Sequence, residues 1–120
     1  MKVAFDLDGT ISAYPAKCED MAAAFVAAGH HVLVLTAHAE PGADPAAVDA
    51  FKREACLSCG FRSFHELVCC IVRNSDEAAA YKAGYCRGHG VDVLIDDAAN
   101  YCRAVKAANP GMLVLHVHEN

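Results

Sequence analysis

The chain of 120 residues is long enough for one domain, spanning 1–120, that buries roughly two-thirds of its unfolded surface, and too short for a second. Its hydrophobic fraction of 55% excludes a disordered chain, and its formal net charge of −5 disfavours a broad nucleic-acid-binding surface. No apolar run approaches the roughly 20 residues of a membrane span, and no signal-peptide pattern follows Met1, so we expect a cytoplasmic protein without membrane partners. Nothing in the composition predicts an oligomer.

Short apolar runs rich in Val, Leu and Ile alternate with helical stretches, which is the pattern of an α/β fold. We predict strands at residues 2–6, 31–36, 67–72, 92–95 and 112–117. We predict helices at residues 15–28, 44–58, 76–88 and 98–108. The strands show little polar alternation, so both faces of the sheet should be covered. The sequence therefore predicts a single Rossmann-like three-layer α/β/α domain with a five-stranded parallel sheet.

Turn-forming residues support these boundaries. Asp44 followed by Pro45 is typical of a helix start. Glycines fall where three of the helices should end, at Gly29, Gly60 and Gly90. Apolar residues recur at helical spacing in two helices, at Val48, Phe51, Ala55, Ala98, Tyr101 and Val105. We expect these side chains to face the sheet as core residues.

Polar side chains gather where the predicted strands end. Asp6 and Asp8 follow the first strand, Thr36 ends the second, and Asp96 and Asp97 end the fourth. Open α/β sheets bind ligands in the crevice at the carboxyl ends of their strands, so these side chains should meet. Several carboxylates at one point repel one another unless a cation neutralises them, and hard oxygen ligands suit Mg²⁺. We therefore predict a Mg²⁺ site with all four aspartates as candidate metal-binding residues.

The spacing of the first two aspartates suggests two different roles. Residues i and i+2 leaving a strand can both face a site, so one of Asp6 and Asp8 could act as nucleophile and the other as proton donor. Gly9 would let the backbone approach a phosphate. For any one aspartate taken alone, the alternative of a turn or helix-capping residue stays open.

The motif Phe5-Asp6-Leu7-Asp8-Gly9-Thr10 resembles the first signature of the haloacid dehalogenase superfamily of phosphohydrolases. Further segments resemble that family's later motifs in order: Leu33–Thr36 the second, Lys82 the third, and Val93–Asp97 the acidic fourth. The resemblance spans residues 2–97. The short segments that follow Gly9 and precede Lys82 resemble the members without a cap domain.

This resemblance implies a Mg²⁺-dependent phosphomonoester hydrolase, a phosphatase that acts through an aspartyl-phosphate intermediate. In it, Asp6 would attack phosphorus, Asp8 would act as acid and then as base, and Asp6 and Asp97 would hold the Mg²⁺. The backbone carbonyl of Asp8 would add a ligand, and Asp96 would be either a further ligand or a supporting residue. The implied catalytic residues are Asp6, Asp8, Thr36 and Lys82, of which Thr36 would bind a phosphoryl oxygen and Lys82 would balance charge.

The expected partner is a phosphorylated substrate, either a small molecule, a nucleotide or a nucleic-acid end. Gly29–Thr36, Leu94–Asp97 and Arg73 look similar to the phosphatase half of phage-type polynucleotide kinase/phosphatases, which implies 3'-phosphate ends. An arginine expected near the end of the second motif is replaced by Ala37 and His38. The candidate substrate-binding residues are Gly9, Thr10, Ala37, His38 and Arg73, although a loop arginine such as Arg73 is also compatible with a solvated charge.

Other classes of function remain open from the sequence. One is a non-catalytic phosphate-binding or scaffold protein with the same fold, and another is a phosphotransferase or mutase. Cys56 and Cys59 have zinc-like spacing, and Cys69 and Cys70 could add ligands, so a metal or thiol module is a further alternative. Adjacent cysteines in a strand point to opposite faces, which disfavours tetrahedral zinc. We expect reduced thiols, because the seven cysteines are an odd number scattered through periodic elements.

Overall fold

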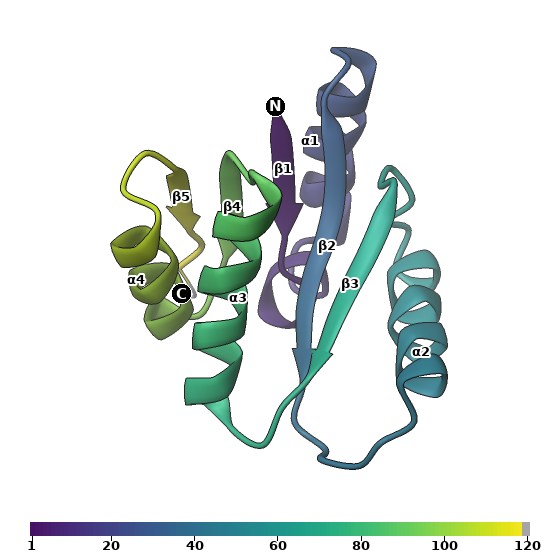
Figure 1. The fold of residues 1–120 in the computed structure, drawn as a ribbon. Helices are drawn as coiled ribbons and strands as arrows, with labels where there is room; N and C mark the ends of the chain where they lie inside the picture. The colour runs from purple at the N-terminus through teal and green to yellow at the C-terminus, as the bar shows by residue number, and fades with distance from the viewer. Residues whose placement is uncertain (119–120) are drawn as a thin grey trace.

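The computed structural model describes residues 1–118, in which strands and helices alternate (Figure 1). The elements are, in order, β1 (Lys2–Phe5), α1 (Pro15–Ala27), β2 (His31–His38), α2 (Pro45–Ser58), β3 (Glu66–Ile71), α3 (Ser75–His89), β4 (Val93–Asp96), α4 (Ala99–Ala108) and β5 (Leu113–His116). The predicted strands and helices are all present, with ends that agree within two residues. An irregular turn, Leu7–Ile11, follows β1, and its backbone is non-helical at Asp8 and Gly9.

The sheet is parallel throughout, in the order β3-β2-β1-β4-β5. Phe5 of the central strand β1 pairs with Val34 of β2 on one side and Ile95 of β4 on the other. The chain runs outward from β1 to β3 and then returns to place β4 beside β1, so the direction of winding reverses between β1 and β4. In such sheets the carboxyl ends of the strands at the reversal flank the ligand-binding crevice.

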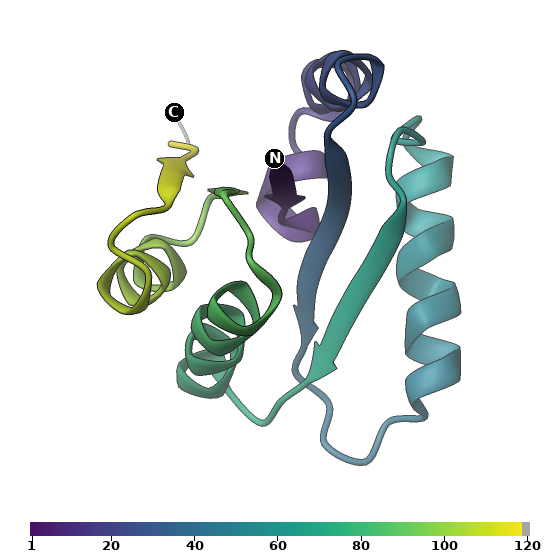
Figure 2. The same cartoon turned by 45° about the horizontal axis from the view of Figure 1, so that its top comes forward.

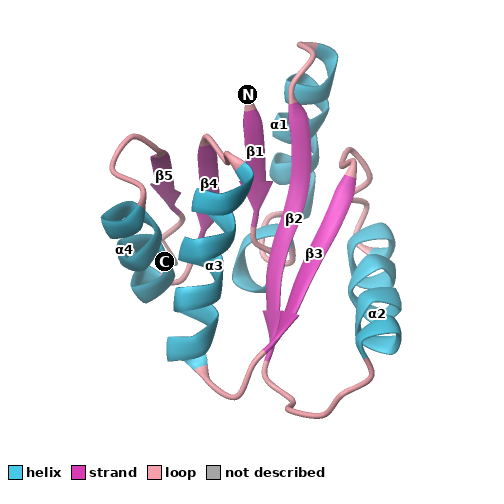
Figure 3. Cartoon of the chain, viewed as in Figure 1, coloured by secondary structure: helices cyan, strands magenta, loops and turns pink. Residues whose placement is uncertain are grey.

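Each face of the sheet is covered by a pair of helices (Figure 3). Val3 and Phe5 of β1 belong to the apolar cluster that includes residues of α1 and α2, whereas Ala4 belongs to the cluster that includes residues of α3 and α4. Figure 2 shows α3 and α4 together on one side of the sheet and α2 on the other. The alternation follows from the two-residue period of a strand. The predicted three-layer α/β/α fold with a five-stranded parallel sheet is confirmed.

Local signals account for the helix boundaries. Asp44 precedes α2 and its Oδ1 accepts a hydrogen bond from the backbone N–H of Ala46 at 3.4 Å, with Pro45 as the first helical residue, as predicted. α3 ends at Gly90, whose φ of 64° lies in the left-handed region that favours glycine. Across residues 1–118, no helix combines the length and apolarity required for a bilayer crossing.

Two residues predicted as core residues are placed differently. The buried stripe of α2 follows Val48, Lys52 and Cys56, so Phe51 lies beside it and is 66% exposed. The i, i+4 row of the helix, rather than the i, i+3 row, faces the sheet. Tyr101 of α4 is half-buried and turns toward the carboxyl end of the sheet. Both corrections place an aromatic ring where a ligand can reach it.

Candidate functional site

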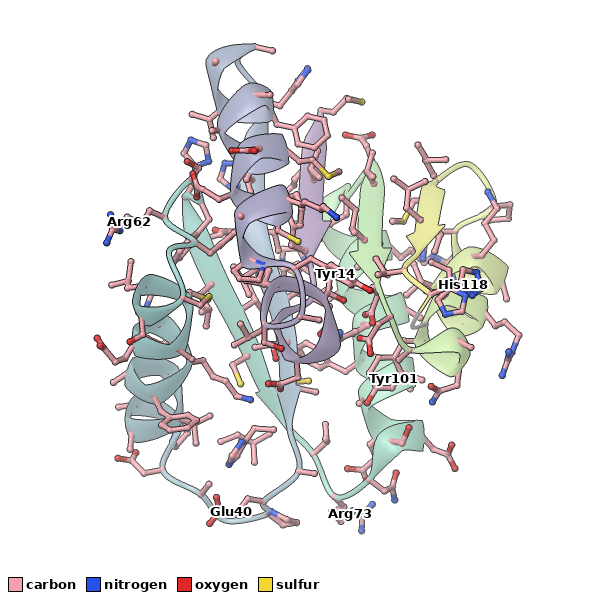
Figure 4. The ribbon with its side chains drawn as sticks, turned by 180° about the vertical axis from the view of Figure 1, so that it is seen from behind. Tyr14, Glu40, Arg62, Arg73, Tyr101 and His118 are labelled. Atoms are coloured by element: carbon pink, nitrogen blue, oxygen red, sulfur yellow. The ribbon has the colours of Figure 1, made fainter. Side chains whose placement is uncertain are left out.

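The ends of β1, β2 and β4 surround a hollow of about 200 Å³, called here the carboxylate pocket. It is lined by Asp6, Asp8, Thr36, Ala37, Asp97, Ala98 and Tyr101. Asp6 directly follows β1, Thr36 lies in β2, and Asp97 directly follows β4, so the reversal in strand order brings them together. Tyr101, from the first half of α4, forms one side of the pocket (Figure 4).

Lys82 of α3 is fully buried beside this pocket. Its Nζ donates to Asp6 Oδ1 at 2.8 Å and to Asp96 Oδ2 at 2.7 Å, and it lies 4.8 Å from the centre of the Tyr101 ring. Burial acts to lower the pKa of Lys82, but the two carboxylates outweigh burial and raise it. The ammonium therefore stays charged and holds Asp6 and Asp96 in place.

Asp6 is the most perturbed carboxyl of the site. Burial raises the pKa of Asp6 to about 8; the Lys82 ammonium opposes this rise and the Asp96 carboxylate reinforces it. The Thr10 hydroxyl lies between two carboxylates, 3.4 Å from Asp6 Oδ2 and 3.3 Å from Asp97 Oδ1. A carboxyl with a pKa of about 8 is mostly protonated at neutral pH, so Asp6 needs a nearby cation to ionise beside the other carboxyl groups.

The oxygen atoms fit a hard divalent cation. Asp6, Asp96 and Asp97 each place one carboxylate oxygen within 4.8 Å of the others. Both oxygens of Asp96 already have partners, because Oδ2 accepts from Lys82 and Oδ1 accepts from the backbone N–H of Ala98 at 3.0 Å. Asp6 Oδ2 and Asp97 Oδ1 have only the longer contacts with the Thr10 hydroxyl among the described residues, at 3.4 and 3.3 Å, so Asp6 and Asp97 are better placed than Asp96 to hold a cation such as Mg²⁺.

Gly9 is required by the geometry of the turn that follows β1. Its φ of 83° is left-handed, and a Cβ atom at this position would overlap the Asp97 carboxylate. The turn can therefore pack against Asp97 because residue 9 has no side chain. The backbone of Gly9 therefore lies against Asp97, a lining residue of the carboxylate pocket.

Thr36 is buried, 1% exposed, at the wall of the pocket. Within residues 1–118 its hydroxyl has no hydrogen-bond partner. An unpaired buried hydroxyl costs about 1–3 kcal/mol, so such groups are rare in folded proteins unless a ligand or water pairs with them. The Thr36 side chain is thus available to a molecule in the pocket.

Three of the predicted site residues are placed away from the cluster. The Asp8 side chain is 71% exposed and its Oδ2 accepts from Lys52 at 3.1 Å, outside the group of Asp6, Asp96 and Asp97. His38 faces a different hollow and pairs with Glu40. Arg73 is exposed and donates from Nε to Glu77 Oε2 at 2.6 Å in the first turn of α3. Figure 4 shows Glu40 and Arg73 at the edge of the molecule.

Sequence reasoning missed two residues of this region. Tyr101 was assigned to the core from its helical spacing, and Lys52 was not singled out at all. The available signal for Lys52 was its position four residues after the apolar Val48, on the row of α2 that is buried. Nothing in the local sequence separates Tyr101 from a core aromatic residue.

Comparison with known proteins gives a fold but no family. No protein-family model and no curated protein matches the sequence. A universal stress protein family member from Burkholderia pseudomallei matches with a TM-score of 0.54 and 16% identity, over 98% of this chain and 96% of the other. A universal stress protein in complex with cAMP matches with a TM-score of 0.56 and 17% identity, over 100% and 98%. At these identities the likeness concerns the fold.

These findings contradict the predicted membership of the haloacid dehalogenase superfamily, because the matching structures are universal stress proteins. The predictions of a phosphomonoester hydrolase and of 3'-phosphate ends as its substrate fall with it, and the matching structures give no clear support to the alternative of a non-catalytic phosphate-binding or scaffold protein with a haloacid dehalogenase-like fold. The physical reason is that, in any sheet of this order, the reversal between β1 and β4 places the residues that follow these strands at one ligand-binding crevice. Aspartates at these two positions therefore do not distinguish one family from another.

Proposed function

We propose that this protein binds a nucleotide through its phosphate group in the carboxylate pocket, together with Mg²⁺. The observation that carries the proposal is the Thr36 hydroxyl, buried beside the carboxylates and without a partner in the described residues. A phosphate oxygen would accept a hydrogen bond from it. The cAMP bound by one structural neighbour supports a nucleotide as the ligand.

The charges of the pocket explain why a cation is part of the proposal. A phosphate would be repelled by Asp6 and Asp97, and Lys82 already pairs with two carboxylates. A divalent cation bound to Asp6 and Asp97 would offset this repulsion and attract the phosphate. Asp96 would act indirectly, because it holds the Lys82 ammonium against Asp6.

Calorimetric titration with adenosine 5'-monophosphate, and with cAMP as a second probe, tests the proposal. We expect binding in Mg²⁺ that EDTA abolishes. Asp97→Asn should weaken binding about tenfold or more, and Thr36→Val should weaken it by a smaller factor, because each removes one polar contact. Asp20→Asn is the matched control, since Asp20 is an exposed aspartate of α1, and it should bind as the wild type does.

The nucleotide should be recovered intact after the titration. Equal affinity with and without Mg²⁺ would overturn the role of the cation, and equal affinity in wild type and Asp97→Asn would overturn the pocket. Release of inorganic phosphate by the wild type, lost in Asp97→Asn, would show turnover in place of simple binding.

A further inference from the structure

A larger hollow of about 380 Å³ lies beside the amino-terminal half of α2, and we call it the α2 groove. It is lined by His38, Glu40, Ala43, Asp44, Ala47, Val48 and Phe51. Its size falls within the range of small-molecule pockets, about 300–1,000 Å³. The carboxylate pocket is smaller, at about 200 Å³, and offers room for the phosphate end of a nucleotide rather than for the whole molecule.

Phe51 gives the groove an aromatic surface that the fold does not use. Its side chain is 66% exposed, although the neighbouring Val48 and Lys52 are buried. Exposing a phenylalanine forgoes the favourable burial of a large apolar side chain. A flat ring beside a hollow is a surface on which a planar group can stack, which contributes about 1–3 kcal/mol for a nucleobase.

The polar atoms of the groove accept hydrogen bonds more readily than they donate them. Glu40 Oε2 lies 2.8 Å from His38 Nε2, and Asp44 uses Oδ1 to cap α2. No lysine or arginine is among the lining residues in the described chain. The groove therefore suits a neutral group that carries hydrogen-bond donors, and it does not suit a phosphate.

Lining residues of the α2 groove and of the carboxylate pocket lie close to one another in the fold. Thr36 lines the pocket, and His38, two residues further along β2 and therefore on the same face of the strand, lines the groove about 7 Å away. Asp8 lines the pocket and pairs with Lys52, which directly follows Phe51 in α2. One ligand can thus present its phosphate to the pocket and its remaining part to the groove.

We propose that the α2 groove holds the base of the nucleotide, with Phe51 stacked on it and Glu40 accepting a hydrogen bond from its exocyclic amino group. This inference rests on the proposed function and names its ligand class: nucleotides whose base carries an amino group. Cytosine and uracil test this directly, since they have the same ring size and differ in an amino group against a carbonyl at one position.

The experiment measures the affinities of cytidine 5'-monophosphate, uridine 5'-monophosphate and ribose 5-phosphate in Mg²⁺ by calorimetry. We expect the wild type to bind the cytidine nucleotide about tenfold more tightly than the uridine nucleotide. Phe51→Ala should weaken both nucleotides about tenfold and leave ribose 5-phosphate unchanged. Glu40→Ala should remove the preference between the two bases, because alanine offers no acceptor to the amino group. Leu57→Ala is the control, because Leu57 is an exposed apolar residue of the same helix, outside the groove.

The outcomes separate the two proposals. If Phe51→Ala leaves all three affinities unchanged while Asp97→Asn weakens them, the groove inference is wrong and the carboxylate pocket stands. If Asp97→Asn also changes nothing, both proposals are wrong. If the wild type binds adenosine 5'-monophosphate but none of the three, only the groove inference is wrong. Thermal melting of each variant shows that it remains folded, as expected for changes at exposed side chains.

Discussion

Lys52 donates from Nζ to Asp8 Oδ2 at 3.1 Å, and the two side chains differ sharply in exposure, 7% for the lysine and 71% for the aspartate. A nearly buried ammonium thus depends on a carboxylate at the surface. Losing the carboxylate leaves a buried charge unpaired, whereas losing the lysine leaves an exposed aspartate that water can solvate.

Removing Asp8 should therefore lower the free energy of unfolding more than removing Lys52 does. We expect Asp8→Asn to lower the free energy of unfolding by about 1–2 kcal/mol, a value reduced for the exposure of Asp8, and Lys52→Met to lower it by less than about 1 kcal/mol. Urea denaturation measures both. Asp49→Asn, which removes an exposed pair with Arg53 on the same helix, serves as control. Equal losses for the two variants would contradict the asymmetry.

Lys82 should be essential for stability. Lys82→Met leaves Asp6 and Asp96 buried without their shared ammonium, and breaking a buried pair in this way costs about 3–5 kcal/mol. Guanidinium denaturation should show this loss directly. A free energy of unfolding within about 1 kcal/mol of the wild-type value would mean that the carboxylates tolerate one another without Lys82.

Thr36 and Thr10 should respond in opposite ways to the same change. Thr36→Val removes a buried hydroxyl that has no partner in the described residues, so we expect stability to be unchanged or to rise by about 1 kcal/mol. Thr10→Val removes a hydroxyl that lies between two carboxylates, so we expect a loss of about 1–3 kcal/mol. Thermal unfolding compares the two variants. A loss in Thr36→Val as large as that in Thr10→Val would show that Thr36 has a partner in solution.

Gly9→Ala should destabilise the protein by about 1–3 kcal/mol, because alanine is strained at a φ of 83° and its methyl group would overlap the Asp97 carboxylate. Gly84→Ala is a matched control inside α3, where a Cβ has nothing within 4 Å. There we expect a gain of about 0.5–1 kcal/mol from higher helix propensity. Urea midpoints that shift in the same direction for both variants would argue against this account.

Glu19 should make stability fall in acid. Its partial burial acts to raise its pKa, but hydrogen bonds from the Ser63 side chain and from the backbone N–H groups of Arg62 and Ser63 outweigh burial and lower the pKa of Glu19. A carboxyl whose pKa is lower in the folded than in the unfolded state stabilises the folded state at pH values above its unfolded-state pKa. This stabilisation is lost as the pH falls through its folded-state pKa.

Glu19→Gln should therefore lose about 1 kcal/mol at neutral pH, a value reduced for solvent exposure, and match the wild type in acid. Chemical denaturation at pH 7 and near pH 3 measures the difference, with Asp20→Asn as control on the same helix. A difference that persists at low pH would show that the effect does not come from the ionised carboxylate.

The pattern of apolar runs and turn residues was enough to predict the strands and helices, because short buried strands and capped helices leave local signals. The prediction failed for Phe51 and Tyr101, where helical spacing identified the periodic positions but not which row of the helix faces the sheet. Choosing between adjacent rows depends on how a helix is rotated against the sheet, which local sequence does not specify. The same limitation hid the burial of Lys52.

The sequence by itself determined the parallel α/β fold and the placement of Asp6, Thr36 and Asp97 at strand ends, since both follow from local patterning. The tertiary structure decided the roles of these residues. It showed that Lys82 donates a hydrogen bond to Asp96 and that Asp8 pairs with Lys52 outside the carboxylate cluster. It also showed that the Thr36 hydroxyl lacks a partner in the described chain. The physical reason is that pairing and burial depend on side-chain directions from elements far apart in sequence, and the packing of the helices on the sheet sets these directions.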